Sequence, residues 1–355
     1  MSDDYLWDGT GAPDEHVQRL EVSLKRFRHR GQPLEWPPLA FAPQQRRMRW
    51  GLWVPASVAA TAIISIVAVF WAPHHRPAPV GISEPGWTIE PLTGAPRLAG
   101  KVMAGAGEAT LNVGQTLETD GRSRASISIS ATGEIQIDPD SRVRLVASTA
   151  ARKRLALDHG TIHAMIWAPA GEFVVDTPNA VAVDLGCAYT LHVDESGAGL
   201  LETTFGWVGF KLAGRESLVP AGAVCPIRPR VGPGTPYFKD ASERFRLALA
   251  RLDSGPPTAE QRQAELTIVL SESRKRDALT LWHLLARVSQ SERGRVYDRL
   301  ALLVPPPPHV ARAGVLRLDP KMLDLWWNEL DLGDMSLWRT WERAWPEDRD
   351  GAKVH

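Results

Sequence analysis

The sequence predicts a mixed, multidomain protein with a helical arm, one transmembrane helix, a mainly-β domain and an α-helical C-terminal domain. Three observations lead to this prediction. An apolar stretch without charged residues occupies residues 51–72, short alternating strands follow between residues 100 and 230, and helical periodicity starts at residue 236. A chain of 355 residues is long enough for two or three domains, each with its own core.

Composition excludes several classes of function. Lys and Arg number 41 and Asp and Glu number 41, so the chain lacks the basic surplus with which proteins bind nucleic acid. Two cysteines are too few for a zinc finger. The sequence also has no Gly-rich phosphate loop, nucleophile elbow or paired-histidine motif. We therefore expect a non-enzymatic protein without a metal or another cofactor.

The arm, residues 1–50, contains one amphipathic helix that begins after Pro13. Leu20, Leu24 and Phe27 form an apolar stripe on it. A single helix of this length has nothing in its own arm to pack against. Three interpretations stay open: a partly ordered segment next to the membrane, a helix that folds onto a cytoplasmic partner through the stripe, or a basic edge that rests on anionic lipid.

Residues 51–72 have the length of a transmembrane helix. Twenty-two residues span about 33 Å in a helix, enough for a hydrocarbon core of about 30 Å. Arg46, Arg47 and Arg49 precede the stretch, whereas Arg76 alone follows it closely. The positive-inside rule therefore places the N-terminus in the cytoplasm and the bulk of the chain outside it.

Residues 73–99 are rich in Pro and Gly and predict a linker, and residues 100–230 predict a β domain. Its strands are short, half-buried and punctuated by glycine, as in a sandwich, barrel or β-roll. We expect strands over residues 126–130, 134–138, 142–146, 154–158, 173–175 and 180–183. Gly160 is expected in a turn, so His159 and His163 flank that turn and are interpreted as ordinary surface or core residues.

Residues 236–355 predict a helical domain. Helices are expected over Ala241–Leu252, Glu260–Leu270, Asp277–Val288 and Arg293–Val304, and another begins at Asp319-Pro320, an N-cap followed by proline. Five tryptophans concentrate near its end, namely Trp326, Trp327, Trp338, Trp341 and Trp345. They indicate packed helix pairs or, alternatively, a ligand surface lined by exposed rings.

The β segment resembles the FecR domain over about residues 100–215. The resemblance depends on the order of six short motifs, which are Gly114–Thr119, Arg124-Ala125, Asp138–Ser141, Leu157–Gly160, Phe173–Pro178 and Gly206–Val208. It implies a periplasmic domain outside a single helix of the bacterial inner membrane. It also implies a cytoplasmic arm that modulates an extracytoplasmic-function sigma factor.

The sequence therefore predicts a FecR-like transmembrane signalling regulator whose partner through the arm is a sigma factor. The alternative is a membrane-anchored envelope binding or scaffold module without a transcriptional role. In either case the outer partner is an envelope protein or polysaccharide of unknown identity.

Cys187 and Cys225 are the only two cysteines, and both fall in the β domain. Outside the cytoplasm a disulfide is chemically permissible. We expect a disulfide between them that ties the strand containing Ala188–Val193 to the end of the domain. Two independent buried thiols are the alternative.

Overall fold

The computed structural model describes residues 86–103, 107–150, 152–212, 214–255, 258–336 and 338–339. They belong to a compact unit that spans Arg76–His355. The predicted arm, the predicted transmembrane segment and the partner stripe Leu20, Leu24 and Phe27 lie outside the described residues. Within the described ranges, no helix combines the length and the apolar character needed to cross a membrane.

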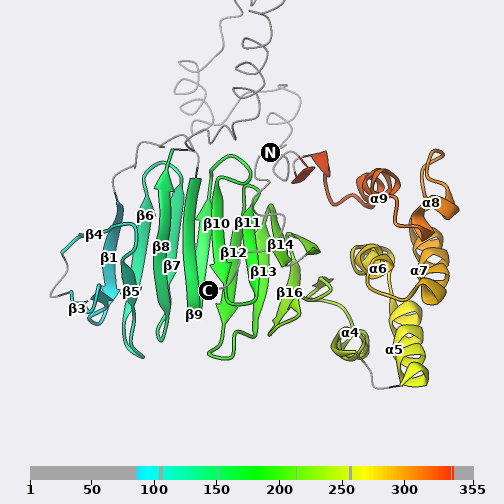
Figure 1. Ribbon diagram of the computed structural model, residues 1–355, viewed down its shortest axis with the longest axis horizontal. Coiled ribbons are helices and arrows are strands. Elements are labelled where there is room, and N and C mark those ends of the chain that lie inside the picture. The colour runs from blue at the N-terminus through cyan, green and yellow to red at the C-terminus, as the bar shows by residue number, and fades with distance from the viewer. Residues whose placement is uncertain are drawn as a thin grey trace, which may run out of the picture. The chain divides into compact units, whose positions relative to one another are not determined.

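The first part of this unit consists of two sheets, A and B, whose strands run side by side in Figure 1. In spatial order, sheet A contains β3 (Lys101–Val102), β2 (Arg97–Leu98), β5 (Thr116–Glu118), β8 (Arg142–Thr149), β9 (Arg152–Ile166), β10 (Phe173–Thr177), β11 (Ala180–Asp184), β14 (Trp207–Leu212) and β15 (Arg215–Pro220). Sheet B contains β4 (Ala109–Leu111), β1 (Trp87–Thr93), β6 (Arg124–Ile129), β7 (Gly133–Ile137), β9, β12 (Ala188–Val193), β13 (Gly199–Phe205) and β16 (Ala223–Arg228), on which β17 (Gly232–Pro233) and β18 (Tyr237–Phe238) pair.

Strand β9 belongs to both sheets and changes from one to the other at Gly160. Residues before Gly160 pair with β8 and β10 in sheet A, and residues after it pair with β7 and β12 in sheet B. Gly160 has φ +101°, and a Cβ on it would overlap Ser141. The predicted turn at Gly160 is therefore wrong. Glycine here provides the bend and the close approach that let one long strand connect two sheets.

One apolar core lies between the two sheets. Trp87 of β1 in sheet B packs on Phe173 of β10 in sheet A, with ring centroids 6.2 Å apart. Its indole N–H donates to Ser148 Oγ of β8 at 3.1 Å. Alternate residues along the strands point into this core, as period-2 patterns require. The domain is therefore a β-sandwich, one of the architectures that the sequence predicts.

The sheet begins earlier than expected. Trp87–Thr93 and Arg97–Leu98 are strands, although the sequence predicts a linker up to residue 99. Pro91 and Gly94 favoured that prediction. Proline is tolerated here because the pairing of β1 with β6 shifts register between Pro91 and Thr93.

The second part of the unit is α-helical, as predicted. Its elements, coloured yellow to red in Figure 1, are α4 (Glu243–Ser254), α5 (Ala259–Glu272), η2 (Lys275–Asp277), α6 (Ala278–Leu285), α7 (Gln290–Leu303), α8 (Arg312–Leu316), α9 (Pro320–Trp327) and η3 (Asn328–Leu330). The Asp319 carboxylate accepts from the backbone N–H groups of Lys321 and Met322, which confirms it as the N-cap of α9. Ser242 caps α4 through the N–H of Phe245.

The described tryptophans of this part pack inside the protein. Trp326, Trp327 and Trp338 are each at most 1% exposed. Trp338 lies against Gly209 of β14, where a Cβ would have no room. Trp327 stacks edge-on against Trp282 at 4.9 Å. For these three rings the packing interpretation is confirmed, and Trp341 and Trp345 lie outside the described residues.

Candidate functional site

The outer face of sheet B, the face turned away from the core, carries the candidate site. Along β9, Ile162, Ala164 and Ile166 are buried, so His163, Met165 and Trp167 point outward. The printed register then places side chains of four neighbouring strands in rows. Gln136 of β7, His163 of β9 and Thr190 of β12 form one row. Glu134, Met165, Ala188 and Phe205 form the next.

The first row is polar and held by hydrogen bonds. The His163 ring contacts Asp138 Oδ2 through Nε2 at 2.9 Å and Thr190 Oγ1 through Nδ1 at 3.0 Å. An ionised carboxylate only accepts, so Nε2 carries a proton, and in the neutral ring Nδ1 accepts from the Thr190 hydroxyl. The ring is thus held in one orientation. Its side chain is 44% exposed, which confirms His163 as a surface residue.

Apart from Glu134, the second row is apolar, and its large side chains are open to solvent. Met165 is 52% exposed, Trp167 is 64% exposed and Phe205 is 72% exposed. Met165 and Phe205 lie opposite Ala188 from its two sides, and Trp167 follows Met165 on the same face. Large apolar side chains grouped on a surface mark a contact site more often than a single exposed residue does. We call Met165, Trp167 and Phe205 the apolar row.

A groove of about 360 Å³ runs over these rows. Its lining combines carboxylate, amide, imidazole and hydroxyl groups with Met165. The Ser126 hydroxyl donates to Glu134 Oε1 at 2.7 Å at its edge. This arrangement suits binding, because polar groups can orient a ligand while apolar groups exclude water. In the described ranges, no group of three or more His, Cys, Asp or Glu side chains could hold a metal ion.

A buried acid lies at the end of β11, inside the same domain. Asp184 is 1% exposed, and burial raises the pKa of its carboxyl to about 7. The carboxyl accepts from the Gly186 N–H at 2.7 Å and from the Cys187 thiol. Burial, followed by the nearby Asp184 charge, raises the pKa of both the Cys187 thiol and the Tyr189 hydroxyl well above their usual values. A thiol in this state is a poor nucleophile.

The predicted disulfide between Cys187 and Cys225 is absent from the structure, in which both residues are free and buried. Cys225 is paired across β13 with Leu201, and Leu201 is paired with Leu191 of β12. Cys187 therefore lies two strands and four residues away from Cys225, roughly 15 Å by strand geometry. A disulfide needs Cα atoms within about 7 Å. Cys187 and Cys225 therefore lie in the same domain but too far apart to form a disulfide.

Cys225 is a core residue with its own partner. Its thiol donates to the Gly234 carbonyl at 3.2 Å, and burial raises its pKa to about 12. The alternative that the sequence left open, two independent buried thiols, describes this state.

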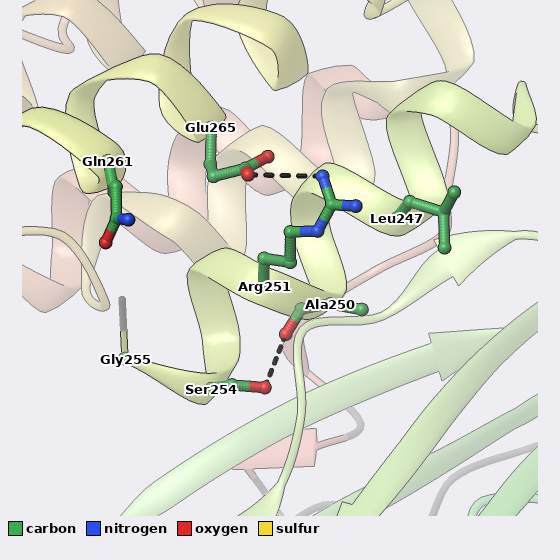
Figure 2. Close-up of a pocket in the computed structure, with 7 residues that line it drawn as sticks. All are labelled: Leu247, Ala250, Arg251, Ser254, Gly255, Gln261 and Glu265. Atoms are coloured by element: carbon green, nitrogen blue, oxygen red, sulfur yellow. Dashed lines mark hydrogen bonds and ion pairs between the residues drawn. The ribbon is translucent and has the colours of Figure 1, made fainter. Parts of the chain in front are cut away.

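A pocket of about 530 Å³ lies between α4 and α5 (Figure 2). Figure 2 shows that its charged groups face one another. Arg251 pairs with Glu265 at 3.3 Å across the two helices, and the Ser254 hydroxyl donates to the Ala250 carbonyl at 2.8 Å. Because Arg251 and Glu265 pair with each other, the charged groups of the pocket are less available to a ligand.

Sequence reasoning missed the apolar row, although a signal for it exists. The run from Thr161 to Trp167 alternates apolar and polar residues up to Ala164, and then places Met165 and Trp167 at outward positions. Treating Gly160 as a turn ended the strand too early to extend this pattern.

Comparisons with known proteins bear on this domain. Residues 115–208 match the family described as FecR protein. No curated protein matches the chain. Two crystal structures of a candidate anti-sigma factor from Parabacteroides distasonis ATCC 8503 overlap with it at TM-scores of 0.32 and 0.31, with 11% and 10% sequence identity. Each overlap covers 38% of this chain and 64% of that chain, less than two thirds of its length. Such scores do not establish a shared fold.

The matched segment runs from β5 to the start of β14. It contains both rows of the outer face of sheet B and the buried Asp184 cluster. The resemblance seen in the sequence is thereby confirmed for residues 115–208, which match the FecR protein family.

Proposed function

We propose that the chain is a FecR-like transmembrane signalling regulator that modulates an extracytoplasmic-function sigma factor. The observation that carries this proposal is the FecR match over residues 115–208. The flanking sequence supports it, since an arginine-rich arm and an apolar stretch of membrane-spanning length precede the domain. In this proposal the protein lies in the bacterial inner membrane, with the arm in the cytoplasm and the FecR domain in the periplasm.

The outer face of sheet B suits the envelope side of this function. Burial of the apolar row by a partner is favourable by about 25 cal/mol per Å² of apolar area removed from water. The fixed His163 ring and the adjacent hydroxyl and carboxylate groups supply directional contacts. Contact with an envelope component on this face is how we propose that the domain receives its signal. The FecR match supports a regulatory role for the domain.

The arm suits the cytoplasmic side. Leu20, Leu24 and Phe27 recur at helical spacing and need a partner to bury them. We propose that a sigma factor covers this stripe. The helix then acts as an amphipathic ligand in a groove of the partner.

Substitution of Leu24 tests this function. The full chain with Leu24→Asp is expected to lose a sigma factor that co-purifies with the parent from its own cells, because an unpaired carboxylate buried in the contact costs several kcal/mol. Gln18→Asp adds the same charge on the opposite side of the predicted helix and should leave capture intact. Mass spectrometry of the eluates, with the amount of membrane-inserted chain as the reference, gives the answer.

Two results would contradict the proposal: equal capture by Leu24→Asp and the parent, or no sigma factor with the parent. Either result favours the second candidate, a membrane-anchored envelope binding module. The exposed apolar row is the observation that favours that candidate, because it needs an outer ligand but no cytoplasmic partner.

A further inference from the structure

A cleft of about 790 Å³ lies where the helices meet sheet A. Its walls come from the start of β15, from the end of α6 and from α9. The residues that line it are Gly214, Arg215, Glu216, Trp282, His283, Ala286, Arg287, Pro320, Lys321, Leu323, Asp324 and Arg339. It falls outside residues 115–208, so the FecR match assigns it no role.

A group of three guanidiniums with one carboxylate lies on one side of the cleft. Arg215 is 3.5 Å from Asp253 of α4, and Arg228 is 3.9 Å from it. Asp253 is also bound by the backbone N–H of Thr235 at 2.6 Å and the Thr235 hydroxyl at 2.7 Å. Arg287 adjoins these groups, and the three arginines with Asp253 carry a net charge of two positive units.

Arg287 is held by neutral groups. Its guanidinium donates to Thr235 Oγ1 at 2.8 Å, to the Glu216 carbonyl at 2.7 Å and to Ser217 Oγ at 2.6 Å. Among the described residues no carboxylate lies within ion-pair distance of it. Burial, together with the neighbouring arginines, lowers its pKa to about 10, although Asp253 opposes this. A cation that is partly buried and fixed in place, without a counter-ion, is stabilised by an anion that approaches it.

The acidic residues of the cleft do not supply that anion. Arg339 holds Asp324 at 2.9 Å and lies 3.6 Å from Glu216. Lys321, at the start of α9, is exposed and forms no ion pair with a described residue. The lining side chains therefore add up to four cations and two carboxylates, a surplus of two positive charges.

The remaining wall is neutral. His283 accepts from the Leu218 N–H through Nε2 at 3.0 Å and contacts the Leu279 carbonyl through Nδ1 at 2.8 Å, so its proton is on Nδ1. Burial lowers its pKa to about 3, so the ring stays uncharged at neutral pH. The half-buried Trp282 ring adds an apolar surface and is fixed by a bond from Nε1 to the Leu323 carbonyl at 3.0 Å.

We propose that this cleft binds a small molecule through an oxyanion, a carboxylate or a phosphate group, which Arg287, Arg215 and Lys321 contact. Arginine forks bind both kinds of oxyanion in a bidentate manner. The ligand bridges β15 to α6 and α9, and so links the FecR-containing sandwich to the helices. This inference does not depend on a sigma-factor partner and would stand if that proposal failed.

Calorimetric titration of the full chain in a neutral detergent tests the site. Inorganic phosphate and citrate are the two probes, each matched in ionic strength with sodium chloride so that screening is constant. We expect saturable binding of at least one probe at one site per chain, and the stronger probe identifies phosphate or carboxylate as the preferred group. Lys321→Gln should weaken it about tenfold and Lys321→Glu further, because a charge-assisted contact is lost.

Lys275→Gln is the matched control, since Lys275 is exposed in η2 and does not line the cleft. It should leave the affinity unchanged. Hydrogen exchange should slow on binding in residues 214–216, 282–287 and 320–324. The proposal is overturned if neither probe binds saturably, if Lys321→Glu binds as tightly as the parent, or if exchange slows elsewhere only. Lys321 is exposed, so these variants do not threaten folding.

Discussion

Burial changes the chemistry of several groups in the described part of the chain, and the carboxyl group of Asp184 is one of them. Asp184 keeps a carboxyl group in the core because two hydrogen-bond donors, the Gly186 N–H and the Cys187 thiol, lie two and three residues further along the chain. Their bonds compensate only part of the desolvation, so the neutral form is favoured and the pKa rises to about 7.

This raised pKa predicts the pH dependence of stability. The folded chain holds the Asp184 proton up to pH of about 7, whereas the unfolded chain loses it near pH 4. The resulting stabilisation is complete at low pH and is lost as the pH rises toward 7, by at most about 4 kcal/mol. Asp184→Asn keeps the acceptor for Gly186 and should abolish this part of the pH profile. Chemical unfolding of both chains between pH 4 and 8 measures it, and parallel profiles would contradict the assignment.

For single residues, the sequence predicts burial better than it predicts which pairs of residues are in contact. Both cysteines lie in the core, as their type suggests. Their pairing could not be predicted, because it depends on strand order, and β13 lies between the two strands concerned. His163 is a surface residue, one of the two interpretations that the sequence allows. Its bond to Asp138, which follows β7, depends on the pairing of β7 with β9, and the predicted turn at Gly160 concealed that pairing.

Among the elements, β9 determines the architecture. A strand of 15 residues can serve two sheets only if it bends, and Gly160 is the residue that permits the bend. The Ser141 hydroxyl occupies the space beside it and accepts from the Thr161 N–H at 2.9 Å. The close approach of β8 and β9 at this point therefore requires a residue without a side chain.

Gly160→Ala should destabilise the fold by about 3 kcal/mol or more, because it combines a left-handed backbone with an overlap against Ser141. Gly114→Ala is the matched control. Gly114 also has a positive φ, +89°, but has open space around it, so only backbone strain of about 1–2 kcal/mol is expected. Unfolding in denaturant compares the two variants. Equal losses of unfolding free energy in the two variants would contradict the claim that the close approach of Ser141 requires glycine at position 160.

The individual elements were largely predictable. Strand β7 and the helices α4, α5 and α7 lie within a few residues of their predicted ranges, because alternation, caps and helical periodicity are local signals. The strands β1 and β2 are not predicted by the sequence, because Pro91 and Gly94 are residue types typical of a linker. Tertiary contacts hold β1 in the sheet, since the Trp87 ring contacts Phe173 and Ser148 of the opposite sheet.

For the whole molecule, the sequence predicts the order of the parts, and the structure adds the surfaces that they present. A FecR domain between an arginine-flanked apolar stretch and a helical part is visible in the sequence. The apolar row and the oxyanion cleft are not, since each is assembled from several strands or helices. The cleft needs Arg215 and Arg287, which are 72 positions apart and are brought together by packing of α6 on β15.

The central claim is that the FecR domain and the arm lie on opposite sides of a membrane. A reporter that is active only outside the cytoplasm, fused after residue 45 or after residue 355, tests it directly. The fusion after residue 355 leaves the sandwich and helices complete and should be active, whereas the fusion after residue 45 should be inactive because Arg46, Arg47 and Arg49 favour the cytoplasmic side. An inactive fusion after residue 355, together with activity there from a reporter that works only in the cytoplasm, would contradict the account.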